Sequence, residues 1–305
     1  MTKTGVLICG HGSRDDEAVR EFELLAAALR PRFPDYDFAT GYLEFARPNI
    51  RDGLAALVER GAQRIYAVPG MLFAASHVKN DLPWEMNSFT AEHPGIDVRL
   101  GRDLAIDVKL INAAADRIAA AAPGDRSDSL LVVVGRGTND PDANSNIAKI
   151  ARMLWEGLGF GWAETAFSGV AQPRVDAALD RAARMGFRRI VVFPYFLFTG
   201  VLVKRIYGAT DEAALRHREV EFVKAGYLRD HPLLLDAFVE RVAEIAEGNP
   251  VMNCQLCKYR TQIVGYEHDA GAPQQAHHHH VRGGDGHHHH HDHDHSSSPP
   301  QAAKV

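Results

Sequence analysis

The sequence has few cysteines and no long apolar run, and both shortages restrict what the protein can be. Three cysteines occur in 305 residues, and Cys254 and Cys257 lie too close together to staple a fold. This excludes a disulfide framework and favours a reducing cytoplasm. No stretch approaches the ~20 apolar residues of a membrane span, and the apolar run within residues 1–10 is too short for a secretory signal. We therefore expect a cytoplasmic protein with no membrane partner.

An excess of positive charge is also missing. The formal net charge is −5, with 24% charged and 46% hydrophobic residues. This is the composition of a globular protein, and not of one that attracts nucleic acid by bulk charge. We expect no nucleic-acid partner, and an anionic ligand would need a local basic cluster. The length allows two domains, each with its own core.

What the sequence does contain is an internal repeat, because a shift of 125 residues places one part of the chain on another without a gap. The matched landmarks are Gly10 and Gly12 on Gly135 and Gly137, Asp15 on Asp140, Pro48 on Pro173, Gly61 on Gly186, Arg64 on Arg189, Pro69 on Pro194, Leu72 and Phe73 on Leu197 and Phe198, Val78 and Lys79 on Val203 and Lys204, and Gly101 on Gly226. The chain is therefore interpreted as a tandem duplication.

Each repeat alternates short apolar runs with segments of helical periodicity. In the first repeat the apolar runs are 5–10, 37–43, 64–72 and 96–101, and the helical segments include 15–29, 48–60 and 107–121. This alternation predicts an α/β fold of two tandem, doubly wound parallel-sheet domains, at 1–125 and 126–248. Residues 249–305 are rich in Pro, Gly, Gln and Ser and predict a mostly disordered tail.

The two repeats differ at the carboxyl ends of their predicted strands, where α/β proteins bind ligands. His11, Glu44 and His77 follow three strands of the first repeat. Their counterparts in the second repeat are Arg136, Gly169 and Leu202. A duplicated fold needs its framework twice but its chemistry once, so we predict one active site, in the first half.

Two imidazoles and a carboxylate suit Co²⁺, Ni²⁺, Fe²⁺ or Zn²⁺, and a histidine can also accept a proton near neutral pH. The alternative is that His11 and His77 only cap the helices that start near Asp15 and run through Asp81. A histidine-phosphatase site is disfavoured because Gly10 stands where that motif has arginine. A dinucleotide loop is disfavoured because Asp15 takes the place of its third glycine.

These residues resemble the class II tetrapyrrole chelatases. The matching motifs are GHGSR at 10–14, Glu44 within GYLEFARP, and HVKNDLP at 77–83. A Met252-Asn-Cys254-Gln-Leu-Cys257 segment, followed by eleven of the 17 histidines between His277 and His295, is similar to the tail of the long, two-domain sirohydrochlorin cobaltochelatases. The broken tract, mixed with aspartate, is unlike an expression tag.

The resemblance implies ATP-independent insertion of Co²⁺ into sirohydrochlorin in cobalamin biosynthesis. His11 and His77 would hold the metal, Glu44 would be a third ligand or proton acceptor, and one histidine would also act as the base. The alternatives are Fe²⁺ or Ni²⁺ as the metal, or a metal-storage or metallochaperone protein in which the tail is the functional part.

The implied substrate is a polycarboxylate, so basic side chains are expected around it. The candidates are Arg14, Arg47, Lys79 and Arg136. An apolar wall for the ring is expected from Met71, Leu72, Phe73, Phe196 and Phe198.

The tail carries two further predictions. The resemblance favours a [4Fe–4S] cluster on Cys254 and Cys257, while Cys9 lies in a predicted buried strand. Four thiolates would then require a homodimer joined through the tails, or ligands other than cysteine. The histidine tract would act as a reservoir of divalent metal.

Overall fold

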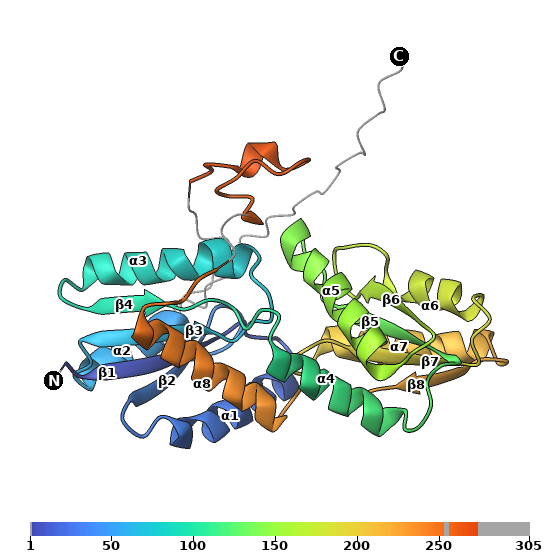
Figure 1. Ribbon diagram of the computed structural model, residues 1–305. Coiled ribbons are helices and arrows are strands. Elements are labelled where there is room, and N and C mark those ends of the chain that lie inside the picture. The colour runs from blue at the N-terminus through green and yellow to red at the C-terminus, as the bar shows by residue number, and fades with distance from the viewer. Residues whose placement is uncertain (1, 253–255, 274–305) are drawn as a thin grey trace, which may run out of the picture.

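The computed structural model describes residues 2–252 and 256–273, and within them the chain forms two four-stranded parallel sheets (Figure 1). The strands are β1 (Thr4–Gly10), β2 (Asp37–Tyr42), β3 (Arg64–Pro69) and β4 (Asp97–Leu100) in the order β2-β1-β3-β4, then β5 (Ser129–Gly135), β6 (Trp162–Phe167), β7 (Arg189–Pro194) and β8 (Glu221–Lys224) in the order β6-β5-β7-β8. The predicted α/β architecture of two parallel sheets is confirmed.

Helices cover both faces of each sheet. The α-helices are α1 (Asp16–Leu29), α2 (Ile50–Glu59), α3 (Leu82–Glu92), α4 (Val108–Ala121), α5 (Pro141–Leu158), α6 (Val175–Ala183), α7 (Val201–Arg216) and α8 (Pro232–Glu247). Short turns are η1 (Arg30–Arg32), the π-helical turn η2 (His77–Asp81) and η4 (Glu267–Asp269). The predicted helix at 48–60 begins two residues later because Asn49 caps it, with its side chain accepting a hydrogen bond from the Asp52 backbone N–H.

The last helix of each repeat, α4 in the first and α8 in the second, makes its main contacts outside its own sheet. The C-terminal helix α8 contacts β3 and α1 of the first half, whereas α4 contacts α5 of the second half and α8 itself. Figure 1 shows α8 lying across the first half and α4 beside α5. Gly101, after β4, leaves the space for this arrangement, because an added Cβ would lie 2.7 Å from Ile245 of α8. The packing units therefore cross the sequence boundary at 125, and the two halves share a continuous apolar core.

Two lysine bridges join the halves, and they occupy matched positions. Lys79 pairs with Asp140, the residue that caps α5, at 2.9 Å, and Lys204 pairs with Asp15, the residue that caps α1, at 2.8 Å. A lysine of each half thus pairs with the aspartate that caps the first helix of the other half, as in a two-fold interface. The Lys79 side chain is only 5% exposed, whereas that of Lys204 is 52% exposed.

Part of the tail is ordered against the rest of the protein. Residues 256–273 form a compact run of turns in which Lys258 is buried and pairs with Asp269 at 2.6 Å. Burial, followed by the charges of Asp269, Asp140 and Asp81, raises the pKa of Tyr259 to about 12. The flexible tail at 249–305 stays a prediction, and this segment is the part of it, beyond Met252, that the structure describes. Cys254 and the tract His277–His295 lie outside the described residues.

Within those same residues, 2–252 and 256–273, none of the helices is both long enough and apolar enough to cross a membrane.

Candidate metal centre

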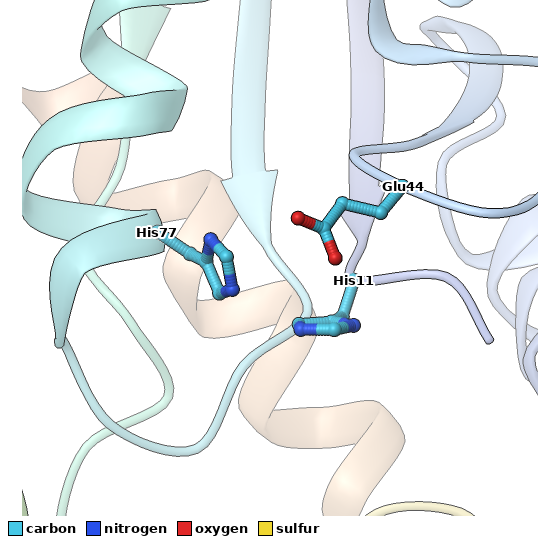
Figure 2. Close-up of side chains that lie close together, drawn as sticks. All are labelled: His11, Glu44 and His77. Carbon is cyan, nitrogen blue, oxygen red and sulfur yellow. The ribbon is translucent and has the colours of Figure 1, made fainter. Parts of the chain in front are cut away.

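Three adjacent strands bring the predicted triad together. His11 follows β1, Glu44 lies just beyond β2, and His77 begins η2 beyond β3. Their ligand atoms lie within 4.8 Å of one another, and the two imidazole rings meet nearly edge to face, with centroids 4.8 Å apart. Figure 2 shows the three side chains pointing toward a common space. The structure thus brings together the three residues that the sequence analysis selected.

The close approach of His11 to Glu44 depends on glycine. Gly12 has a φ of +88°, and a Cβ added to it would lie 1.7 Å from the Glu44 carbonyl oxygen. A side chain at this position would therefore push the two segments apart. The Glu44 backbone N–H donates to the His11 carbonyl at 3.0 Å, so the two ligand-bearing segments are also joined directly.

The His11 ring has one satisfied nitrogen and one that lacks a protein partner. Its Nδ1 lies 2.9 Å from the Gly12 carbonyl oxygen, which makes Nδ1 the protonated donor and leaves a lone pair on Nε2. Nε2 is buried and has no hydrogen-bond partner. Burial, and then the neighbouring His77, lower the pKa of His11 to about 4. The ring is therefore neutral at physiological pH, in the form that binds metal.

His77 is oriented by a buried carboxylate. Its Nδ1 lies 2.6 Å from Oδ2 of Asp81, a residue with no solvent exposure, and Asn80 donates to the other carboxylate oxygen at 2.7 Å. A carboxylate on Nδ1 fixes the ring orientation and directs Nε2 toward a metal. The π-helical turn closes through a bond from the Leu82 N–H to the His77 carbonyl, and such turns occur frequently at functional sites.

The helix-capping alternative fails for both histidines. Asp15 is the residue that caps α1, because its side chain accepts from the Glu17 N–H. His77 bonds to a side chain four residues ahead and not to a helix-terminal N–H.

The second half has no equivalent triad among residues 2–252 and 256–273. Gly169 stands at the Glu44 position, where an added Cβ would lie 2.3 Å from the Arg136 carbonyl oxygen. A carboxylate there would need a different backbone path.

The loop that leads from β3 to His77 is held by a second buried carboxylate. Asp103 accepts from the Ala74 N–H at 2.8 Å, and its burial raises the pKa of this carboxyl to about 6, against the opposing effect of Arg102 and Lys79. In the second half the matched Thr199 N–H is bound at 2.7 Å by Glu21, which comes from α1 of the first half. Asp103 and Glu21 were not anticipated, because their partners are backbone groups of distant segments.

Two members of the triad, His11 and His77, line a cleft of about 390 Å³ between the halves. The five predicted wall residues, Met71, Leu72, Phe73, Phe196 and Phe198, all line it. Tyr42, Phe45 and Tyr195 also line it and were missed, although Phe45 directly follows Glu44 and could have been noticed for that reason. The cleft is therefore apolar on its walls and carries the two histidines of the triad on its first-half side.

The four predicted basic residues separate into two groups. Arg14 and Arg136 line the cleft, with the Arg14 guanidinium 4.8 Å from the centre of the Phe45 ring. Arg47 pairs with Asp52 at 3.3 Å, and Lys79 pairs with Asp140, and neither lines the cleft. The substrate contacts expected of Arg47 and Lys79 stay predictions, and in this structure each of the two side chains forms an ion pair within the protein.

Comparison with known proteins identifies the family. The model of the CbiX family matches residues 5–121 and again residues 130–245. The chain belongs to the CbiX family. Because both repeats match one model, the duplication inferred from the sequence is a duplication of the CbiX unit.

Relatives of the chain are named for different metals. It is 36% identical over 262 residues to the sirohydrochlorin cobaltochelatase of Priestia megaterium, with 85% of each chain covered. It is 31% identical over 250 residues to the sirohydrochlorin ferrochelatase of the same organism, covering 80% of this chain and 92% of the relative. The structure of the sirohydrochlorin chelatase SirB from Bacillus subtilis subspecies spizizenii in complex with cobalt matches with a TM-score of 0.69 at 27% identity, over 81% of this chain and 96% of that one.

Proposed function

We propose that the protein inserts Co²⁺ into sirohydrochlorin, without ATP, as a step of cobalamin biosynthesis in the cytoplasm. The observation that carries this proposal is the buried, unpartnered Nε2 of His11 within a triad that also holds His77 and Glu44. Membership of the CbiX family and the 36% identity to a sirohydrochlorin cobaltochelatase support the choice of substrate and metal.

In this proposal the two imidazoles hold Co²⁺ through Nε2. His11 is neutral because of its low pKa, and His77 is kept in the required tautomer by Asp81. Glu44 is a third ligand or the acceptor of a proton. Insertion exchanges one divalent cation for two pyrrolic protons, so charge is conserved when both protons leave to bases at the site or to water. The remaining metal positions are open toward the macrocycle.

The macrocycle is proposed to lie in the cleft between the halves. Its apolar faces would contact the aromatic walls, and its carboxylates would meet Arg14 and Arg136. The first half would be the catalytic unit and the second half a non-catalytic unit that completes the binding site. This division explains why the chain keeps two frameworks and one triad.

Fe²⁺ is the second candidate metal, because the 31% identical relative is named a ferrochelatase. The donor types do not discriminate between the two ions, and Ni²⁺ would also bind them. A storage or metallochaperone role is disfavoured by the aromatic cleft between the halves, since a metal store needs no site for a large organic ring.

The tail is proposed to bind metal in addition. Cys257 is a buried free thiol, and Cys9 lies within the core at β1. Within the described residues, 2–252 and 256–273, no set of cysteines lies close enough together to hold a [4Fe–4S] cluster. A cluster would therefore require Cys254 together with the tail of a second chain or other ligands, and the histidine tract would serve as a metal reservoir.

The test is to mix the protein with sirohydrochlorin and Co²⁺, Fe²⁺ or Ni²⁺ and to follow the absorption spectrum of the tetrapyrrole. We expect fastest insertion with Co²⁺ and loss of insertion in His11→Ala and His77→Ala. The control His268→Ala, which removes an exposed imidazole in the tail segment, should keep wild-type rates. Full activity in both triad variants would exclude the assigned site, and loss of activity only after truncation at Gly248 would favour the tail as the functional part.

A further inference from the structure

Three arginines surround the strand ends of the second half, at the place that matches the metal triad. They are Arg136 after β5, Arg174 at the start of α6 and Arg205 in the first turns of α7. The residues at the corresponding positions of the first half are His11, Asn49 and Asn80. Positions that are uncharged around the metal site are therefore all cationic in the second half. We refer to Arg136, Arg174 and Arg205 as the arginine rim. Arg136 lines the cleft, whereas Arg174 and Arg205 lie outside its lining and bond to the adjoining backbone of Gly169 and Ser168.

Two of these guanidinium groups are fixed by neighbouring carbonyls. Arg174 donates through Nη1 to the Gly169 carbonyl, and Arg205 donates through Nη1 to the Ser168 carbonyl at 3.1 Å. The Ser168 hydroxyl donates in turn to the carbonyl of Leu202, a residue that lines the cleft. One nitrogen of each guanidinium is thus used for positioning. The other N–H groups remain available for a planar, two-oxygen acceptor.

The rim arginines have no salt-bridge partner within the described part of the chain, although the charge of Glu44 acts on Arg136. Among residues 2–252 and 256–273, none of these three arginines forms an ion pair with a carboxylate. In contrast, Arg181, Arg189 and Arg216 of the same half each do. Arg136 extends into the cleft, where its charge acts on both His11 and Glu44.

The backbone adds to the same electrostatic potential. Helices α6 and α7 begin beside the rim, and neither has a side-chain cap on its first N–H groups. The first-half helix that matches α6 is α2, which is capped by Asn49; both helices carry one aspartate in the first turn, Asp52 in α2 and Asp176 in α6. Uncapped N-termini carry partial positive charge that favours anions. The uncapped N–H groups of α6 and α7 therefore add positive potential beside the arginines, reduced at α6 by Asp176.

We propose that the arginine rim is a binding site for carboxylates, and that it holds the carboxylate side chains of the tetrapyrrole while the triad of the other half presents the metal. This inference rests on the proposed substrate and adds Arg174 and Arg205 to its binding site. The duplication then supplies two different uses of one strand-end position: a metal site in one copy and an anion site in the other.

The test uses porphyrin binding without metal, so that it does not depend on insertion. Fluorescence titration with uroporphyrin, an octacarboxylate, and coproporphyrin, a tetracarboxylate, gives Kd for wild type, Arg174→Gln, Arg205→Gln and the double variant. We expect each single change to weaken uroporphyrin binding about tenfold, the usual effect of losing a charge-assisted hydrogen bond, and to weaken coproporphyrin binding less. The matched control Arg184→Gln removes an exposed arginine at the far end of α6 and should leave Kd unchanged.

A second readout separates this proposal from the proposed function. With sirohydrochlorin and Co²⁺, rim variants should raise KM and leave kcat close to wild type, because they act on binding and not on the metal. If wild type binds uroporphyrin but inserts no metal, the proposed function fails while the rim is still tested by Kd. Wild-type Kd in the double variant, with its fold verified by circular dichroism, would overturn the rim. Equal weakening in Arg184→Gln would overturn it as well, since bulk charge alone would then explain binding.

Discussion

The two halves of the molecule share a framework and differ in the chemistry at their strand ends. Strands β1, β2 and β3 recur at a shift of 125 residues as β5, β6 and β7, with the same lengths. The residues that follow these strands are His11, Glu44 and His77 in one half and Arg136, Gly169 and Leu202 in the other. The comparison teaches that one sheet framework can present different side chains at equivalent strand ends, because the segments that follow the strands differ.

The difference extends to backbone geometry. In the first half, β3 leads into the π-helical turn η2 before α3 begins, whereas the matched segment of the second half is the regular helix α7. Asp81 ends the π-helical turn and holds His77, and its counterpart Ile206 is a core residue. The first half therefore contains a local departure from regular helix at the residue that we propose binds metal.

The largest expected effect comes from exchanging the matched residues. His77→Leu makes the first half resemble the second and removes one of the proposed metal ligands, so we expect kcat/KM for Co²⁺ insertion to fall on the order of 100-fold or more. Adding Leu202→His should not restore activity, because Ile206 cannot orient the new imidazole as Asp81 does. Recovery in the double variant, measured by the tetrapyrrole spectrum, would mean that the halves are interchangeable.

The two lysine bridges provide a comparison of stability. Lys79→Met leaves Asp140 buried without its partner and should lower the free energy of unfolding by about 3 kcal/mol. Lys204→Met breaks the matched but exposed pair with Asp15 and should cost less than about 1 kcal/mol. Urea denaturation of both variants measures the difference. Similar losses would show that burial does not distinguish the two bridges.

The buried carboxyl of Asp103 should make stability depend on pH. Its folded pKa of about 6 lies above the ordinary value of 3.8. The folded state therefore holds its proton more tightly, and this group favours folding below about pH 4 and less so as pH rises through 6. Asp103→Asn keeps an oxygen acceptor for the Ala74 N–H and removes the buried charge. Its stability relative to wild type should rise by up to about 3 kcal/mol between pH 4 and pH 7, and a difference independent of pH would contradict this.

Much of the framework could be predicted from the sequence, because parallel strands in the middle of a sheet must be apolar along their length. The run at 5–10 therefore marks β1 closely. The positions of α4 and α8 could not be predicted in this way. An apolar helix face shows that a helix is buried, but not whether it packs on its own sheet or on the other one.

The candidate site could be predicted in part, because adjacent strands bring together residues that are far apart in the sequence. The triad follows from β2-β1-β3 adjacency, and the repeat showed which residues are particular to one half. The role of Lys79 was not predictable, because its partner Asp140 belongs to the other half. Asp81 was visible in the sequence only as part of a motif, since its contact with His77 depends on the geometry of the intervening turn.

The smallest functional effect, on Co²⁺ affinity, is expected at Asp81. A change at this residue tests whether the two halves differ only in the proposed metal ligands or also in the residues that orient those ligands. Asp81→Asn keeps the size of the side chain but removes the charge that orients His77 Nδ1. We expect about a tenfold loss of Co²⁺ affinity, the usual result of losing a carboxylate partner of a metal-binding histidine. Calorimetric titration with Co²⁺ measures this, with thermal unfolding as a check on folding. If the variant binds Co²⁺ as tightly as wild type does, the ligands alone define the metal centre. In that case the replacement of Asp81 by Ile206 does not explain why the second half lacks a metal site.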